Sequence, residues 1–176
     1  MRPDGDAMRL RAEALGEPGQ RRFRLLAIID RETHIVWLEK EQLRRLGQAL
    51  GQVLENLPNI GPDLTSTNSM LEFDLETRSQ FRAGRMELGY DEGRDRILVI
   101  AHEIEADADE PAALSLRISR AQAREIAEES EIVVSAGRPL CPLCSRPMGP
   151  EPHVCAKQNG HFPKRLEEVQ GEEADA

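Results

Sequence analysis

The chain has 176 residues, of which 39% are hydrophobic and 31% are charged, and its formal net charge is −9. This length fits one globular domain of ordinary size with a small additional segment. The acidic balance argues against broad electrostatic binding to nucleic acid or to anionic membranes, because both require a basic surface. Since there is neither an apolar run long enough to cross a membrane nor a secretory leader, we expect a cytoplasmic protein.

The first part of the chain predicts a frayed end followed by three strands. Residues 1–7 are polar and are expected to be frayed. Apolar and charged residues alternate over 9–14, and the Pro-Gly pair in 17–20 is typical of a type II turn. Residues 22–29 become apolar on both faces, which indicates a central strand, and 35–38 predict a third strand.

A helix is predicted next, over 39–57, because leucines recur there at helical spacing. Gly47 and Gly51 weaken this helix and mark points of close packing. Residues 58–69 are rich in turn formers and predict a loop. The alternation over 71–75 fits either a short edge strand or a loop held by its apolar residues.

The same order of elements is then predicted a second time. A strand over 81–90 carries a bulge at Gly84, and after a turn a second central strand covers 97–104. Clean alternation predicts a strand over 114–118, and a capping box starts a helix over 119–135. The chain therefore repeats a strand-strand-strand-helix unit.

Residues that periodicity does not require also match between the two units, which favours an internal duplication. Leu38–Leu46 matches Ile118–Ile126 at a constant offset, and the match includes Gln42 with Gln122. Three matches are predicted in the strands: Arg11-Ala12 with Arg82-Ala83, Leu15-Gly16 with Leu88-Gly89, and Gly19 with Gly93. We expect an α+β domain over 8–136, with halves of about 8–57 and 81–136. Their strands would join in one antiparallel assembly, and the two helices would be related by an approximate two-fold axis.

All three cysteines lie in the segment 137–162, in the order Cys141, Cys144 and Cys155, together with His153 and His161. Thiolate sulfur and imidazole nitrogen are preferred zinc donors, and a closed structural site needs four of them. Pro142, Pro147, Pro150 and Pro152 disfavour a helix and an independent hydrophobic core in this segment, so the metal would replace the core. The segment predicts a zinc knuckle with one structural zinc.

Two other interpretations of the cysteines fit the sequence less well. A redox disulfide normally lies at a helix N-terminus, whereas the residues after Cys144 cannot start a helix. A structural disulfide would leave one cysteine over and would not explain the histidines. By spacing alone, the fourth ligand is either His153 or His161.

Residues 138–165 contain five basic residues and one acidic residue. Residues 163–176 form an acidic tail that we expect to be disordered. The basic residues favour a solvated surface over a docking surface for nucleic acid. Aromatic residues for base stacking are scarce, at 3% of the chain, so nucleic-acid binding is not expected.

Several stretches resemble one uncharacterised bacterial family, catalogued as domain of unknown function 3090. They are GEPGQRRFRL, LEKEQL, GRMELGYDEGRDRI and AGRPLCPLC, followed by HVC and NGH. The resemblance implies no activity, since none is established for the family. It favours Cys141, Cys144, His153 and Cys155 as the metal ligands, because related sequences resemble this one at HVC. The sequence departs from the family at Ser145, where a glycine is usual.

The sequence favours a zinc-binding, non-enzymatic adaptor that binds a protein partner. Its alternatives are a nucleic-acid-associated zinc protein and a metal-dependent enzyme. An enzyme has few candidate residues, since His34 and His102 are single histidines within predicted strands. Only a site made of the three cysteines alone would leave an open position for catalysis.

Overall fold

The computed structural model describes residues 2–17, 19–59, 70–136, 141–144, 146, 148, 154, 155 and 157. The chain divides into two compact units, Met1–Ala136 and Gly137–Ala176. The first unit contains β1 (Asp4–Leu15), β2 (Arg22–Ile29), β3 (Glu32–Leu38), α1 (Lys40–Asn56), β4 (Gln80–Asp91), β5 (Arg96–Glu103), β6 (Leu114–Ile118) and α2 (Arg120–Ser135).

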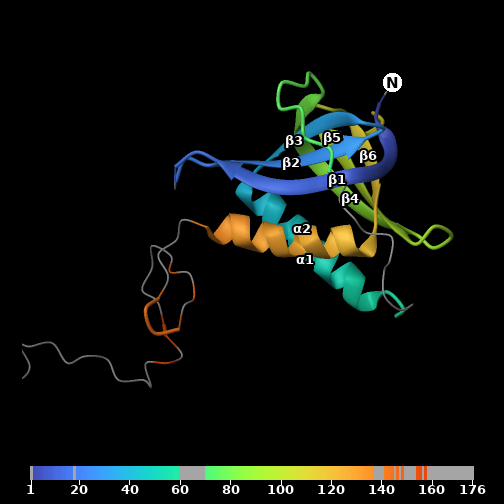
Figure 1. Ribbon diagram of the computed structural model, residues 1–176. Coiled ribbons are helices and arrows are strands. Elements are labelled where there is room, and N and C mark those ends of the chain that lie inside the picture. The colour runs from blue at the N-terminus through green and yellow to red at the C-terminus, as the bar shows by residue number, and fades with distance from the viewer. Residues whose placement is uncertain are drawn as a thin grey trace, which may run out of the picture. The chain divides into compact units, whose positions relative to one another are not determined.

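The six strands form one closed barrel in sequence order, and both helices lie on the same side of it (Figure 1). Pairing is antiparallel inside each half, between β1, β2 and β3 and between β4, β5 and β6. The junctions between the halves, β3 with β4 and β6 with β1, are parallel. The predicted α+β fold with a repeated β-β-β-α unit is confirmed.

The parallel junctions follow from the odd number of strands in each half. In a three-stranded antiparallel unit the first and last strands run in the same direction. The second half is related to the first by a rotation about the barrel axis, which leaves the direction of each strand along this axis unchanged. The last strand of each half therefore pairs in parallel with the first strand of the other half. Both helices then leave the barrel at the same end, which explains why α1 and α2 lie together.

The strand registers define which residues of the two halves are equivalent. β1 is bulged between Ala7 and Arg9, and β4 is bulged between Ala83 and Met86. The hairpins end at the pairs Leu15↔Arg22 and Asp91↔Arg96. Residues of β1 therefore correspond to residues 76 positions later in β4, and residues of β2 to residues 74 positions later in β5.

The predicted equivalence of the first strands was wrong by three to five residues, because it set Leu15 against Leu88 and Arg11 against Arg82. Apolar alternation has a period of two, so it fits several registers, whereas the bulges select one. The offset of 80 between Gln42 and Gln122, and hence between α1 and α2, agrees with the structure. Each glutamine is the third helical residue after its cap.

The two glutamines hold the halves together. The side-chain nitrogen of Gln42 donates to the carbonyls of Ala83 (3.0 Å) and Gly84 (2.9 Å), at the bulge of β4. In the equivalent place, Gln122 donates to the carbonyl of Ala7 at 2.8 Å, at the bulge of β1. Each side-chain oxygen also accepts the amide hydrogen of its own helix cap, as in a capping box. One side chain thus starts a helix and fixes the first strand of the other half.

One hydrophobic core fills the barrel and continues to the helices. The residues that the repeat predicts to be equivalent are all buried in it: Leu43 and Ala123 at 0% exposure, Leu46 at 5% and Ile126 at 1%. Residues 4–7, predicted to be frayed, instead start β1, because the backbone of residues 4–6 pairs with β6 although Asp4 and Asp6 are polar. Among the described residues, no helix has the length and apolar character needed to span a membrane.

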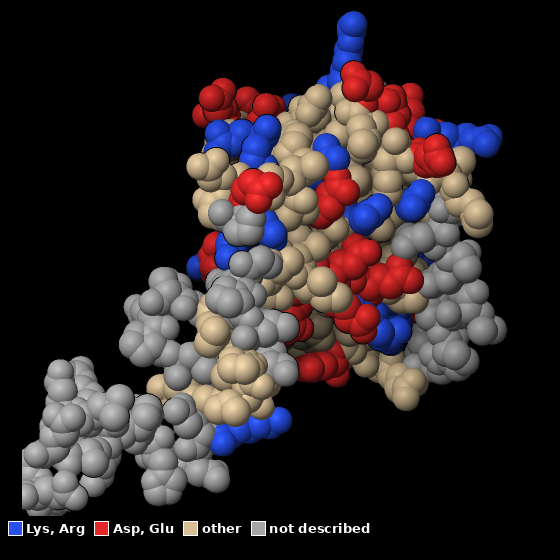
Figure 2. Space-filling view, turned by 60° about the vertical axis from the view of Figure 1, so that its left-hand side comes forward, with Lys and Arg blue, Asp and Glu red and all other residues tan. Residues whose placement is uncertain are grey.

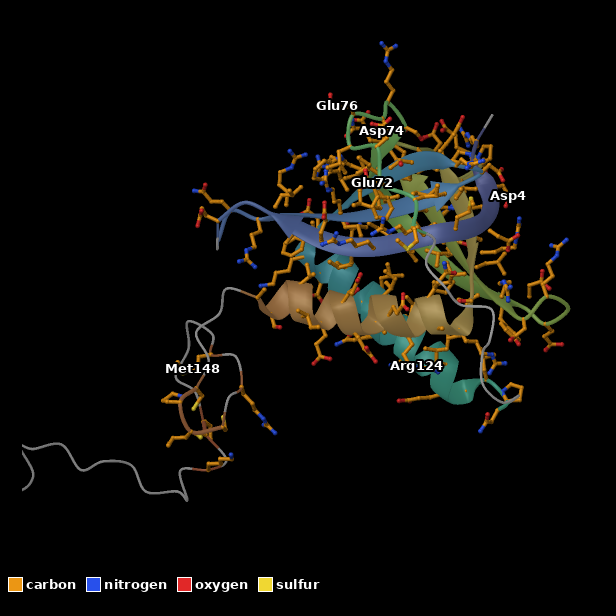
Figure 3. All side chains as sticks on the ribbon, viewed as in Figure 1. Asp4, Glu72, Asp74, Glu76, Arg124 and Met148 are labelled. Carbon is orange, nitrogen blue, oxygen red and sulfur yellow. The ribbon has the colours of Figure 1, made fainter. Side chains whose placement is uncertain are left out.

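A segment without regular structure, residues 70–79, lies against β1 and β3. Arg9 of β1 stacks on the ring of Phe73 at 4.7 Å, and the amide of Asp74 donates to the Thr33 hydroxyl at 2.9 Å. Of the two predicted alternatives for 71–75, the loop is therefore the one observed. The segment carries three acidic side chains, which are labelled in Figure 3: Glu72, Asp74 and Glu76.

The helices cross closely at Gly47, where an added Cβ would lie 2.8 Å from the Cβ of Ser130. Gly47→Ala should gain helix propensity of about 1 kcal/mol but lose more to overpacking, which costs about 1–3 kcal/mol. We expect a net fall in the free energy of unfolding. Gly51 has open space around the same position, so Gly51→Ala should stabilise the protein by about 0.5–1 kcal/mol. If the denaturation midpoints of both variants shift in the same direction from that of the wild-type protein, this interpretation is wrong.

Candidate metal centre

The second unit brings the three cysteines together without a helix or strand in its described residues. A turn covers 142–144, directly after Cys141, and the amide of Cys141 donates to the carbonyl of Arg146 at 2.8 Å. Pro142 suits such a turn, because its ring presets φ for the second position. The short turn aims Cys141 and Cys144 at one point, as the Cys-x-x-Cys spacing predicted.

The sulfur atoms of Cys141, Cys144 and Cys155 all lie within 4.8 Å of one another. The distance from Cys141 Sγ to Cys155 Sγ is 3.7 Å. A disulfide bond is about 2.05 Å long, so these two sulfurs are not bonded to each other. A tetrahedron with metal–sulfur bonds of about 2.3 Å has edges of about 3.8 Å, which agrees with this separation. The three cysteines can therefore hold a metal ion.

The backbone around Cys141 favours its ionised form, which is the form that binds metal. Amide groups of Cys144 and Leu143 donate to its sulfur and lower the pKa of the thiol to about 6, against the opposing effect of burial. Burial has the larger effect at Cys155 and raises the pKa of that thiol. Cys141 and Cys155 are only 5% and 8% exposed. The backbone thus favours the ionised form at one ligand, and binding of a cation would favour loss of the protons of the other cysteines.

The structure brings together three of the four predicted ligands. His153, and the alternative ligand His161, lie outside the described residues. The sequence did not predict the backbone amide groups that lower the pKa of the Cys141 thiol, because every residue except proline has such a group.

The two histidines of the barrel unit have structural partners. The Nδ1 of His34 lies 2.6 Å from the Ser79 hydroxyl, and burial lowers the pKa of this histidine. The Nε2 of His102 lies 3.4 Å from a carboxylate oxygen of Glu87, and the ring also contacts Arg85. Within the described part of the chain, the three cysteines are the only group of metal-binding side chains that converges on one point.

Comparison with known proteins identifies a family but no activity. A family model described as "Protein of unknown function (DUF3090)" matches residues 5–155, which include both units up to the third cysteine. No curated protein matches the chain, and no solved structure matches it.

Proposed function

We propose that this chain, which belongs to the DUF3090 family of proteins of unknown function, is a non-enzymatic zinc-binding adaptor. The observation that carries the proposal is the convergence of three cysteine sulfurs, two of them 3.7 Å apart as on the edge of a zinc tetrahedron. In this proposal Cys141, Cys144, His153 and Cys155 hold one zinc ion.

Zinc is the metal that this donor set favours. Thiolates select soft or borderline ions, and sites with three cysteines and one histidine are common for structural zinc. Four protein ligands leave no position for water or substrate, so the ion would stabilise the unit and take no part in a reaction. If the three cysteines were the only ligands, the open fourth position would instead suit a catalytic metal.

The surface beside the metal ligands supports a role in binding a protein. Leu143, inside the Cys-x-x-Cys turn, is 53% exposed, and Val154, next to Cys155, is 89% exposed. Both side chains are apolar and neighbour a ligand in the chain, so a bound metal would hold them in fixed positions. A partner with a small apolar surface could cover them.

Protein purified without chelator is expected to contain about one zinc ion per chain, because four ligands make one tetrahedral site. The matched variants His153→Ala and His161→Ala test the fourth ligand. The first should weaken zinc binding and change the absorption spectrum of the cobalt-substituted protein, and the second should leave both unchanged. The proposal is contradicted if the purified protein contains no metal, all three thiols can be titrated and the second unit is nevertheless folded. If His161→Ala weakens zinc binding and His153→Ala does not, the fourth ligand is His161.

A further inference from the structure

A small basic pocket lies at the end of the barrel where β3 passes into α1. Its volume is about 280 Å³. The charged residues that line it are Arg21, Arg22, Arg82 and Glu39, and its aromatic residues are Trp37 and Phe23. The lining thus has an excess of two positive charges, whereas acidic and basic side chains are interspersed over the face shown in Figure 2. We call this site the Trp37 pocket.

The three arginines keep hydrogen-bonding capacity for a ligand. Arg82 pairs with Glu39 at 3.2 Å, but both side chains are more than half exposed, at 62% and 72%, so the pair is weak. The Cζ of Arg22 lies 4.0 Å from the centroid of the Trp37 ring, a cation–π contact that needs no hydrogen-bond acceptor. Arg21 donates from Nη1 to the Ala136 carbonyl, while its buried Nε has no partner among the described residues.

The duplication provides an internal comparison for this pocket. The registers place Asp95 at the position of Arg21, Arg96 at that of Arg22, and Asp6 at that of Arg82, while Arg117 corresponds to Trp37. Two arginines and two aspartates therefore occupy the second half, where the Trp37 pocket has three arginines and one glutamate.

Carboxylates neutralise the arginines of the second half. Arg117 lies 2.9 Å from Asp4 and 3.5 Å from Asp6, and Arg96 lies 3.9 Å from Asp6. Asp4 is labelled at the start of β1 in Figure 3. Asp95 accepts hydrogen bonds from Arg120 at 2.9 Å and from the Tyr90 hydroxyl at 2.6 Å. The repeat thus contains two equivalent sites. In one, positive and negative charges balance, and in the other, the Trp37 pocket, arginines stand in place of the two aspartates.

We propose that the Trp37 pocket binds the phosphate group of a small phosphorylated molecule through Arg21, Arg22 and Arg82. Guanidinium groups present pairs of parallel N–H donors that match phosphate oxygens, and such charge-assisted bonds are about twice as strong as neutral ones. Three of them around one hollow provide charge and donors for a dianion. The volume of about 280 Å³ lies at the lower end of small-molecule sites, so it fits a phosphate with a small attached group.

Titration of the full-length protein with inorganic phosphate and with ribose 5-phosphate, at constant ionic strength, tests this site. We expect saturable binding of both, with chemical shift changes in the Trp37 indole N–H. Arg82→Asp introduces the residue that the second half has at this position and should weaken binding at least about tenfold. Arg22→Gln should also weaken it, and it provides a second reading if Arg82→Asp folds poorly.

Arg96→Gln is the matched control, because it removes the same charge at the position equivalent to Arg22. It should change phosphate affinity less than about twofold. The proposal is overturned if the wild-type protein shows no saturable binding, or if Arg96→Gln weakens binding as much as Arg22→Gln does. It is also overturned if a short DNA oligonucleotide binds the pocket more tightly than both small ligands, which would assign the arginines to a nucleic-acid backbone.

Discussion

Replacing Cys144 by serine is expected to release the metal and expose the second unit to protease. A serine hydroxyl is a poor substitute for a thiolate as a zinc ligand. Loss of an outer-shell partner alone lowers metal affinity about 10–100-fold, so loss of a direct ligand should exceed about 100-fold. The described part of this unit has no helix or strand to stabilise it instead, so metal binding and folding should be lost together.

The barrel unit provides the control for this experiment. All of the core residues that fill it lie between Ala7 and Val134, so its thermal unfolding should be unchanged in Cys144→Ser. Zinc content, measured by elemental analysis, and limited proteolysis followed by mass spectrometry give the two readouts. A variant that keeps stoichiometric zinc, or one in which the barrel unit unfolds with the second unit, would contradict this account.

Replacing Gln122 by leucine should produce the largest loss of stability in the barrel unit for a change that conserves side-chain size. Gln122 is only 6% exposed, and leucine would leave both the Ser119 amide and the Ala7 carbonyl without their partner. Each unsatisfied buried group costs about 1–3 kcal/mol, so for two such groups the free energy of unfolding should fall by about 2–6 kcal/mol. Chemical denaturation of the variant measures this loss.

Gln42→Leu is the matched variant at the equivalent position. Gln42 makes the same kinds of hydrogen bond, but it is half-buried and lines the Trp37 pocket, where water can replace the lost partner. We expect a loss of about 1 kcal/mol there. Equal losses of stability in the two variants would show that burial of the glutamine does not determine the loss. A loss below about 0.5 kcal/mol in Gln122→Leu would show that Gln122 does not hold the two halves together.

Most of the secondary structure could be predicted because local patterns determine it. β2 and β6 have the predicted bounds, and the capping box at Ser119 starts α2 as expected. The start of β1 was missed because Asp4 and Asp6 have no strand-like pattern, and their place comes from backbone pairing with a strand more than 100 residues away. Contacts of this kind depend on the fold and have no local signal.

The candidate sites differ in the same way. The cysteine cluster was predictable because its ligands lie close together in the sequence and their chemistry is specific. The Trp37 pocket was not, since Arg22 begins β2 directly after Arg21, Arg82 comes from β4, and none of the three is distinctive in the sequence. The difference between Arg82 and Asp6, which occupy equivalent positions in the two halves, does indicate the pocket. This equivalence can be recognised only when the strand registers are known.

The closure of the barrel between its first and last strands has a consequence for synthesis. β1 leaves the ribosome before its neighbour β6, which lies about 100 residues later in the chain, at residues 114–118. Until then, the backbone of residues 4–6 is an open strand edge that another nascent chain could join. Asp4 and Asp6 place negative charge along this edge, which discourages pairing with another copy. When β6 arrives, Arg117 forms ion pairs with both aspartates, so the residues that protect the waiting strand also help to select its proper neighbour.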